Sequence, residues 1–90
     1  MEISSPILRP VAGRKNKLKT ILRHRRVIGE AIRFRRKSSG YTQERLAEQV
    51  SLNPKYLGEI ERGEKIISIE ALLRVAKAVK TPMCEFFRGL

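Results

Sequence analysis

The pattern of apolar and polar positions predicts short amphipathic helices over the second half of the chain. Leu46, Ala47 and Val50 lie one to three residues apart, and Leu57 and Ile60 continue a helical pattern a few residues later. Side chains at such intervals share one face of an α-helix, and no segment alternates as a half-buried strand does. Two further sets show the same periodicity: Ile69, Leu72, Leu73, Val75, Ala76 and Val79, and then Met83, Phe86 and Phe87. We expect an all-helical fold.

Residues that stabilise helix starts bound these segments. Thr42, Asn53 and Ser68 each precede a predicted helix, and each carries a side-chain oxygen that can accept a hydrogen bond from a free backbone N–H group. The Thr81-Pro82 pair provides a start for a short last helix, because proline suits a first helical turn. The expected helices therefore span about 43–50, 54–61 and 69–79, with a short one after Pro82.

The first helix has two possible starts. No Ser, Thr, Asp or Asn directly precedes Val27, whereas Asn16 and Thr20 could each cap an earlier start. Gly29 costs about 1 kcal/mol relative to alanine inside a helix, so it is also consistent with a break. Both interpretations stay open. If the helix starts early, one of its faces carries Leu18, Ile21, Leu22, Ile28 and Ile32.

Composition limits the chain to one small domain. It has 90 residues, of which 41% are hydrophobic, and its single cysteine, Cys84, cannot form an internal disulfide. No apolar run exceeds three residues, whereas a membrane span needs about 20. We therefore expect no membrane association and no export, and we expect a prokaryotic cytoplasmic or nucleoid location.

Candidate catalytic chemistry is sparse. The sequence has no aspartate, and its one histidine, His24, lies within a basic run. Neither a metal-ligand cluster nor a glycine-rich phosphate loop is present. We therefore do not expect an enzyme, and we expect no metal, no cofactor and no small-molecule substrate.

The net charge of +11 is concentrated near the N-terminus. Residues 1–26 hold eight Lys or Arg against one Glu, or +7, and residues 27–90 hold twelve against eight, or +4. We expect a basic N-terminal arm over 1–26, disordered or partly helical, followed by one domain over 27–90. Nucleic acid is the favoured partner of the arm, because Lys or Arg on a phosphate releases counterions. Acidic lipid, a solubilising tail and an organelle transit peptide are the alternatives.

The chain over residues 28–87 resembles the phage-repressor (Cro-repressor, or xenobiotic-response-element) type of helix-turn-helix domain. The matching text is GYTQERLA at 40–47, YLGEIERG at 56–63 and SIEALLRVAKAV at 68–79, preceded by Ile28-Gly29, Ile32-Arg33 and Arg36. Residues 61–78 also resemble controller proteins of restriction systems. The resemblance implies a compact five-helix, lambda-repressor-like DNA-binding domain, here with a basic N-terminal extension.

Two positions depart from the family pattern. Ser51 stands where the family commonly has glycine at the start of the turn, and a left-handed backbone there would cost about 1 kcal/mol. Gly58 stands in a helix interior where the family often has serine. A glycine there weakens the helix, and it would also permit a close approach to DNA.

The resemblance implies that the helix at about 54–61 reads the major groove of double-stranded DNA. Gln43, at the start of the preceding helix, is expected to hold a phosphate. Lys55 would donate either to guanine or to phosphate. Glu59 would accept from cytosine, and the alternative is an exposed helix rim.

Four more residues complete the expected DNA-binding set. Asn53 caps its helix first and contacts DNA second, and Tyr56 combines a phosphate-donating hydroxyl with a packing ring. Arg62 and Lys65 would clamp the DNA backbone, although Arg62 could instead stabilise the C-terminal end of its helix.

Two further interactions are expected. In the family, the positions of Arg36 and Glu61 form an inward-facing ion pair that ties the first helix to the third. A stripe at the C-terminus would either close the core or meet its copy in a homodimer, with one of the two phenylalanines filling the core. This stripe consists of Met83, Phe86, Phe87 and Leu90.

The sequence therefore predicts a sequence-specific transcriptional regulator, a repressor acting by promoter occlusion as a homodimer on double-stranded DNA. One alternative is an antitoxin or adaptor that binds a protein partner, with DNA binding for autoregulation. Another is an RNA or ribosome-surface binder that uses the arm, although surface aromatics for base stacking are lacking.

Overall fold

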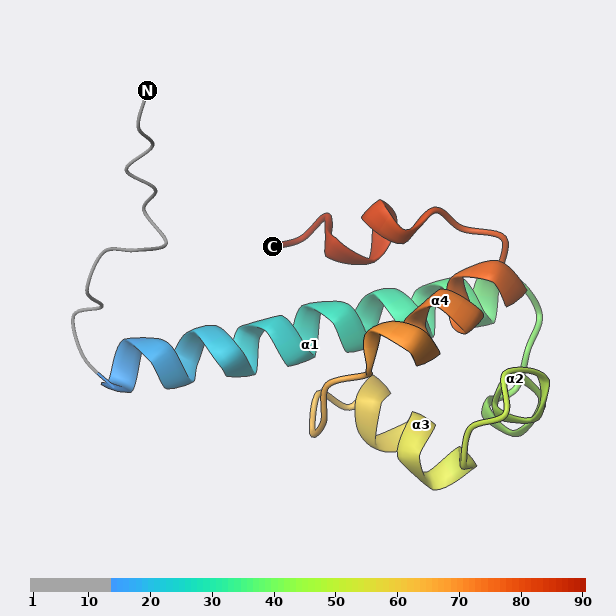
Figure 1. Ribbon diagram of the computed structural model, residues 1–90, viewed down its shortest axis with the longest axis horizontal. Helices are drawn as coiled ribbons and strands as arrows, with labels where there is room; N and C mark the ends of the chain where they lie inside the picture. The colour runs from blue at the N-terminus through green and yellow to red at the C-terminus, as the bar shows by residue number, and fades with distance from the viewer. Residues whose placement is uncertain (1–13) are drawn as a thin grey trace.

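A computed structural model describes residues 14–90, so the first thirteen residues of the expected arm lie outside the described part. Over this range the chain forms four α-helices and one 3-10 helix, with no strand. Figure 1 shows one long helix with the shorter elements packed around its C-terminal half. These elements are α1 (Arg14–Ser38), α2 (Gln43–Gln49), α3 (Pro54–Glu61), α4 (Ile69–Ala78) and η2 (Met83–Phe87). The all-helical prediction is confirmed.

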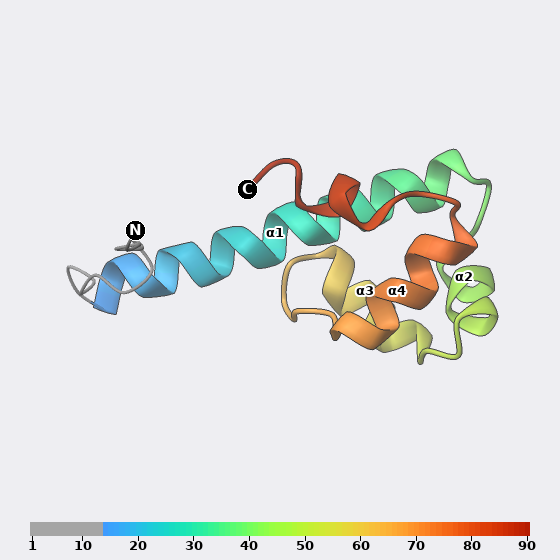
Figure 2. The ribbon, with the colours of Figure 1, turned by 45° about the horizontal axis from the view of Figure 1, so that its top comes forward.

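The long helix α1 takes the earlier of its two possible starts. It begins at Arg14 and continues through Gly29 without a break, so the expected boundary at 26/27 falls inside a helix. Ile28 and Ile32 are buried, whereas Leu18, Ile21 and Leu22 on the preceding turns are exposed. The N-terminal turns of α1 therefore extend beyond the core, as both ribbon views show (Figure 2).

The core receives side chains from every helix. The largest fully buried side chains are those of Ile32, Leu46, Leu57, Ile60, Leu72, Val75 and Phe86. Phe86 thus meets the expectation that one of the two phenylalanines fills the core. Its place in the expected dimer surface is wrong, because a side chain with no exposed area cannot contact a partner.

The three predicted caps form as expected. Thr42 Oγ1 accepts from the Arg45 N–H at 3.1 Å, and Asn53 Oδ1 accepts from the Lys55 N–H at 2.7 Å. Ser68 Oγ accepts from the Ala71 N–H at 3.1 Å. These bonds satisfy N–H groups that have no partner within their own helix, and they fix where α2, α3 and α4 begin.

The helices α2 and α4 end in the same way. Ser51 and Lys80 follow their helices with φ angles of 58° and 52°. In each case the next N–H donates back to the helix, from Leu52 to the Ala47 carbonyl at 2.8 Å and from Thr81 to the Ala76 carbonyl at 2.9 Å. Glycine usually occupies this left-handed position. The strain expected at Ser51 is therefore present.

The C-terminal segment returns along α1 (Figures 1 and 2). Arg23 donates to the Gly89 carbonyl at 2.8 Å, and Arg35 forms an ion pair with Glu85 at 3.3 Å. Arg88 also donates to Glu85 and, with Arg35, lowers the pKa of that carboxyl. These bonds hold η2 against the helix that also supports α3.

Candidate nucleic-acid interface

The exposed side of α3 carries a shallow hollow lined by polar side chains. Its volume is about 240 Å³. The residues that line it are Asn53, Lys55, Tyr56, Glu59 and Lys65. The structure thus brings together five of the seven side chains that the sequence assigned to DNA contact.

The other two expected contacts, Gln43 and Arg62, meet above Gly58. A Cβ atom at position 58 would lie 3.2 Å from Arg62 Nη1 and 3.5 Å from Gln43 Oε1. Gly58 therefore leaves room for both side chains to lie over this turn of α3. Gln43 Nε2 also donates to Glu61 Oε1 at 2.9 Å, so part of its amide is used within the fold.

Two ion pairs lie at this interface. Lys65 Nζ is 3.4 Å from Glu59 Oε1, and Arg62 Nε donates to Glu64 Oε2 at 2.8 Å. A second bond joins Arg62 Nη2 to Glu64 Oε1 at 3.3 Å. The hydrogen bond from Arg62 lowers the pKa of Glu64, and the same bond raises the pKa of Arg62. Both carboxylates thus neutralise bases that were expected to face DNA.

Glu64 was missed at the level of sequence. It follows the end of α3, and it pairs with a residue two positions earlier across a turn at Gly63, where φ is 78°. Helical spacing does not bring residues i and i+2 together. The available signal was an acidic residue placed directly between two bases, Arg62 and Lys65.

Asn53 and Tyr56 contribute to the scaffold as well as to the hollow. The Asn53 side chain is used in its cap, while the Tyr56 hydroxyl donates to the Ile66 carbonyl at 3.3 Å. The Tyr56 ring packs against the hydrophobic core. These contacts hold the two ends of the polar hollow in place.

A buried ion pair fixes α3 against α1. Arg36 Nε donates to Glu61 Oε2 at 2.6 Å, and Arg36 Nη2 donates to Glu61 Oε1 at 3.0 Å. Both residues are buried, and Arg36 also donates to the Tyr41 carbonyl at 2.9 Å. With the bond from Gln43, this network joins α1, α2 and α3 behind the exposed side of α3.

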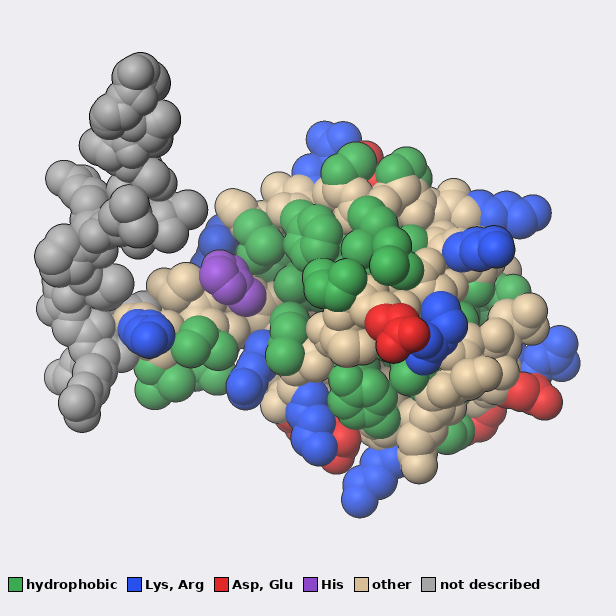
Figure 3. Space-filling model, in the orientation of Figure 1, with side chains coloured by type: hydrophobic (Ala, Val, Ile, Leu, Met, Phe, Trp, Pro, Cys, Tyr) green, Lys and Arg blue, Asp and Glu red, His purple; other side chains and the backbone are tan. Residues whose placement is uncertain are grey.

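A different face of the molecule is apolar. Leu90 is 44% exposed, while Met83 and Phe87 are half-buried. A hollow of about 330 Å³ lies between the C-terminal segment and α1, lined by Ile21, His24, Arg25, Ile28, Ile66, Phe87 and Leu90. Figure 3 shows hydrophobic side chains gathered around the single histidine and across this side of the molecule.

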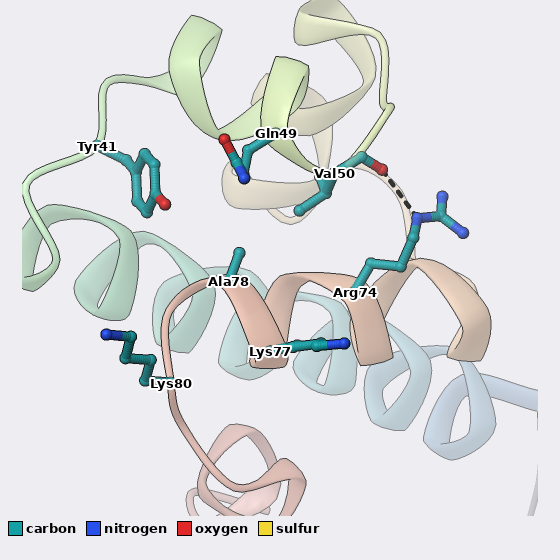
Figure 4. A pocket seen from close by; sticks show the side chains of 7 residues that line it. All are labelled: Tyr41, Gln49, Val50, Arg74, Lys77, Ala78 and Lys80. Atoms are coloured by element: carbon teal, nitrogen blue, oxygen red, sulfur yellow. Dashed lines mark hydrogen bonds between the residues drawn. The ribbon is translucent and has the colours of Figure 1, made fainter.

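A larger hollow, of about 510 Å³, opens between α2 and α4 (Figure 4). Arg74 lines it and donates to the Val50 carbonyl at 2.8 Å, at the end of α2. Lys77 and Lys80 lie at its edge, close to the end of α4. Cations at these places stabilise the free carbonyl groups of the helix C-termini. The positive charge here therefore has a structural explanation.

No other chemical centre appears over residues 14–90. No group of three or more His, Cys, Asp or Glu side chains in this range could hold a metal ion. Among the same residues, no helix is both long and apolar enough to cross a bilayer.

Comparison with known proteins places this geometry in a known group. The chain is 34% identical over 55 residues to the control protein C.SmaI of Serratia marcescens, an alignment that covers 61% of this chain and 66% of that relative. The chain therefore spans just under two thirds of the length of this curated relative.

Two solved structures share the fold. The clp gene regulator ClgR of Corynebacterium glutamicum superposes with a TM-score of 0.69 at 35% identity, covering 72% of this chain and 69% of that one. The restriction-modification controller protein C.AhdI of Aeromonas hydrophila gives a TM-score of 0.66 at 29% identity, covering 77% and 98%. Residues 32–86 match the family described as helix-turn-helix, and the chain belongs to this family of transcriptional regulators.

Proposed function

We propose that the chain is a sequence-specific DNA-binding repressor that reads the major groove with α3. The observation that carries this proposal is the hollow on the exposed side of α3, where five polar side chains converge. The buried Arg36–Glu61 pair supports it, because it holds α3 rigidly against α1. A reading helix needs such support, since hydrogen bonds to base edges tolerate little misplacement.

Lys55 is the proposed base-reading cation. It is exposed near the start of α3, and none of the described residues pairs with its ammonium group. Guanine presents two acceptors in the major groove, which Lys55 would contact. Glu59, held near Lys65, would accept from a cytosine amino group on the same edge.

Gln43, Arg62 and Lys65 are the proposed contacts to the DNA backbone. They lie on the elements that flank α3, where contacts to phosphate fix the register of a reading helix. The basic turns of α1 and the rest of the 1–26 arm would add further phosphate contacts. Tyr56 and Asn53 would contribute secondary contacts beside their structural bonds.

The proposed active form is a homodimer. One domain reads few base pairs, and a two-fold dimer places two reading helices about one helical turn of DNA apart. The apolar face with Met83, Phe87 and Leu90 is the proposed contact, and it continues onto Ile21 of α1 through the hollow between them. Burying this face would remove exposed apolar area from water.

The proposed mode of action is promoter occlusion in a prokaryotic cytoplasm or nucleoid. The relatives are described as a control protein, a gene regulator and a controller protein, which agrees with regulation of transcription. We propose that the chain has no enzymatic activity of its own.

The proposal is tested by selecting binding sites from a random duplex library with the full chain at about 150 mM salt. Enrichment of a palindrome with half-sites about one turn apart is the expected outcome. Retention of duplexes without any enriched sequence would contradict sequence reading. Retention of no duplex, with co-purification of a second small protein, would favour the adaptor alternative.

A further inference from the structure

Two of the three bases proposed to face DNA are paired within the chain. Arg62 makes two hydrogen bonds to Glu64, at 2.8 and 3.3 Å, and Lys65 lies 3.4 Å from Glu59. Each carboxylate belongs to the same short stretch as the base that it neutralises. The positive charge at this surface is therefore smaller than the sequence alone suggests.

The Arg62 guanidinium lies where a DNA phosphate contact is proposed. Its Nη1 atom is close to Gly58, next to the amide of Gln43 at the start of α2. The side chains of Arg62 and Glu64 are 59% and 54% exposed, so solvent and other ions reach both. An exposed pair of this kind exchanges its partner readily. A phosphate could thus replace the carboxylate.

We propose that Glu64 and Glu59 compete with DNA phosphates for Arg62 and Lys65, and so limit the sequence-independent part of the DNA affinity. This inference rests on the proposed function. A base that is already neutralised must first leave its carboxylate, and that carboxylate then repels the incoming phosphate. The lowered pKa of Glu64 keeps it ionised near neutral pH.

The competition serves a chain with a net charge of +11. Such a charge favours retention on any duplex, because each phosphate contact releases counterions whatever the base sequence. Carboxylates beside the backbone-contacting bases lower this retention. Lys55 stays free to contact DNA, since no described residue pairs with it.

The test measures binding of full-length chains to one random-sequence duplex over a salt series. Glu64→Gln removes the competitor and preserves the size of the side chain. Glu48→Gln is the matched control, because Glu48 is an exposed residue of α2 whose carboxylate has no partner among the described residues. Both variants change the net charge by one unit.

Glu64→Gln is expected to bind about fivefold more tightly at ~150 mM salt, with a log–log salt slope steeper by about 0.9, as one added phosphate contact requires. Glu48→Gln is expected to change the affinity by less than about twofold and to leave the slope unaltered. A double-mutant comparison identifies the base involved. In an Arg62→Gln background, Glu64→Gln should have no more effect than the control.

Equal effects of Glu64→Gln and Glu48→Gln would overturn this inference while leaving DNA binding intact. An undiminished effect of Glu64→Gln in the Arg62→Gln background would also overturn it, because the gain would then come from general charge. Failure of every chain to bind duplex at low salt would instead overturn the proposed function, and this inference with it.

Discussion

Gly29 of α1 lies directly against the backbone of Ile60 in the last turn of α3. A Cβ atom at position 29 would collide with the Ile60 carbonyl oxygen and would also lie 3.1 Å from the Glu61 carbonyl oxygen. Both neighbours are backbone atoms of a packed helix, which cannot move without shifting α3. The glycine that the sequence left open as a break is therefore a site of close helix packing.

We predict that Gly29→Ala destabilises the fold by at least about 1–3 kcal/mol, as overpacking of a tight contact does. The free energy of unfolding in denaturant measures this effect. A stability equal to that of the unsubstituted chain would mean that α1 and α3 do not meet this closely.

Gly58→Ala is the matched comparison and should have the opposite sign. A Cβ atom here would meet only the ends of two flexible side chains, those of Arg62 and Gln43. The gain in helix propensity, up to about 1 kcal/mol, should therefore dominate. Destabilisation comparable to that of Gly29→Ala would contradict this account of α3.

Glu61→Ala should cost about 3–5 kcal/mol, because it leaves the buried Arg36 guanidinium without its carboxylate. Glu59→Ala breaks a pair with an exposed lysine and should cost at most about 1 kcal/mol. Thermal melts of the two variants measure the difference. Equal shifts in melting temperature would refute the division between support and DNA contact.

Ser51→Gly should stabilise the chain by about 1 kcal/mol, because it relieves a left-handed backbone at φ 58°. The greater freedom of glycine in the unfolded chain offsets part of the gain. Ser39→Gly is the control, since Ser39 lies in a turn without a positive φ. A stabilisation of the same size at both positions would show that strain is not the cause.

Leu90→Lys should shift the protein from dimer to monomer in sedimentation at micromolar concentration, because it places a charge in the proposed apolar contact. The equivalent change at Ile69 should leave the dimer intact, since Ile69 is exposed on α4 and does not line the hollow beside Leu90. A chain without substitutions that sediments only as a monomer would disprove the dimer.

Local signals could be predicted from the sequence, and contacts between distant residues largely could not. Thr42, Asn53 and Ser68 were identified as caps because a cap depends on residues two or three positions away. The Arg36–Glu61 pair spans 25 positions and was expected only because of the family resemblance. The Glu64 pair escaped because it forms across a turn.

Phe86 and the start of α1 show the same limit from another side. Phe86 and Phe87 are neighbours in a 3-10 helix, so periodicity could not tell which one faces the core. Asn16 and Thr20 suggested early starts, and α1 begins before both. The exposed Leu18 and Leu22 then continue the apolar stripe beyond the core, where the sequence pattern does not distinguish burial from exposure.

The central claim is that α3 reads the base sequence, and site selection with two lysine variants tests it most directly. Lys55→Ala removes the proposed base-reading cation, and Lys77→Ala removes an equal charge from α4. We predict that Lys55→Ala relaxes the preference at one or two positions of each half-site, at a cost of about 1–3 kcal/mol, whereas Lys77→Ala enriches the original sequence. Enrichment of one unchanged sequence by both variants would contradict base reading by Lys55 from α3.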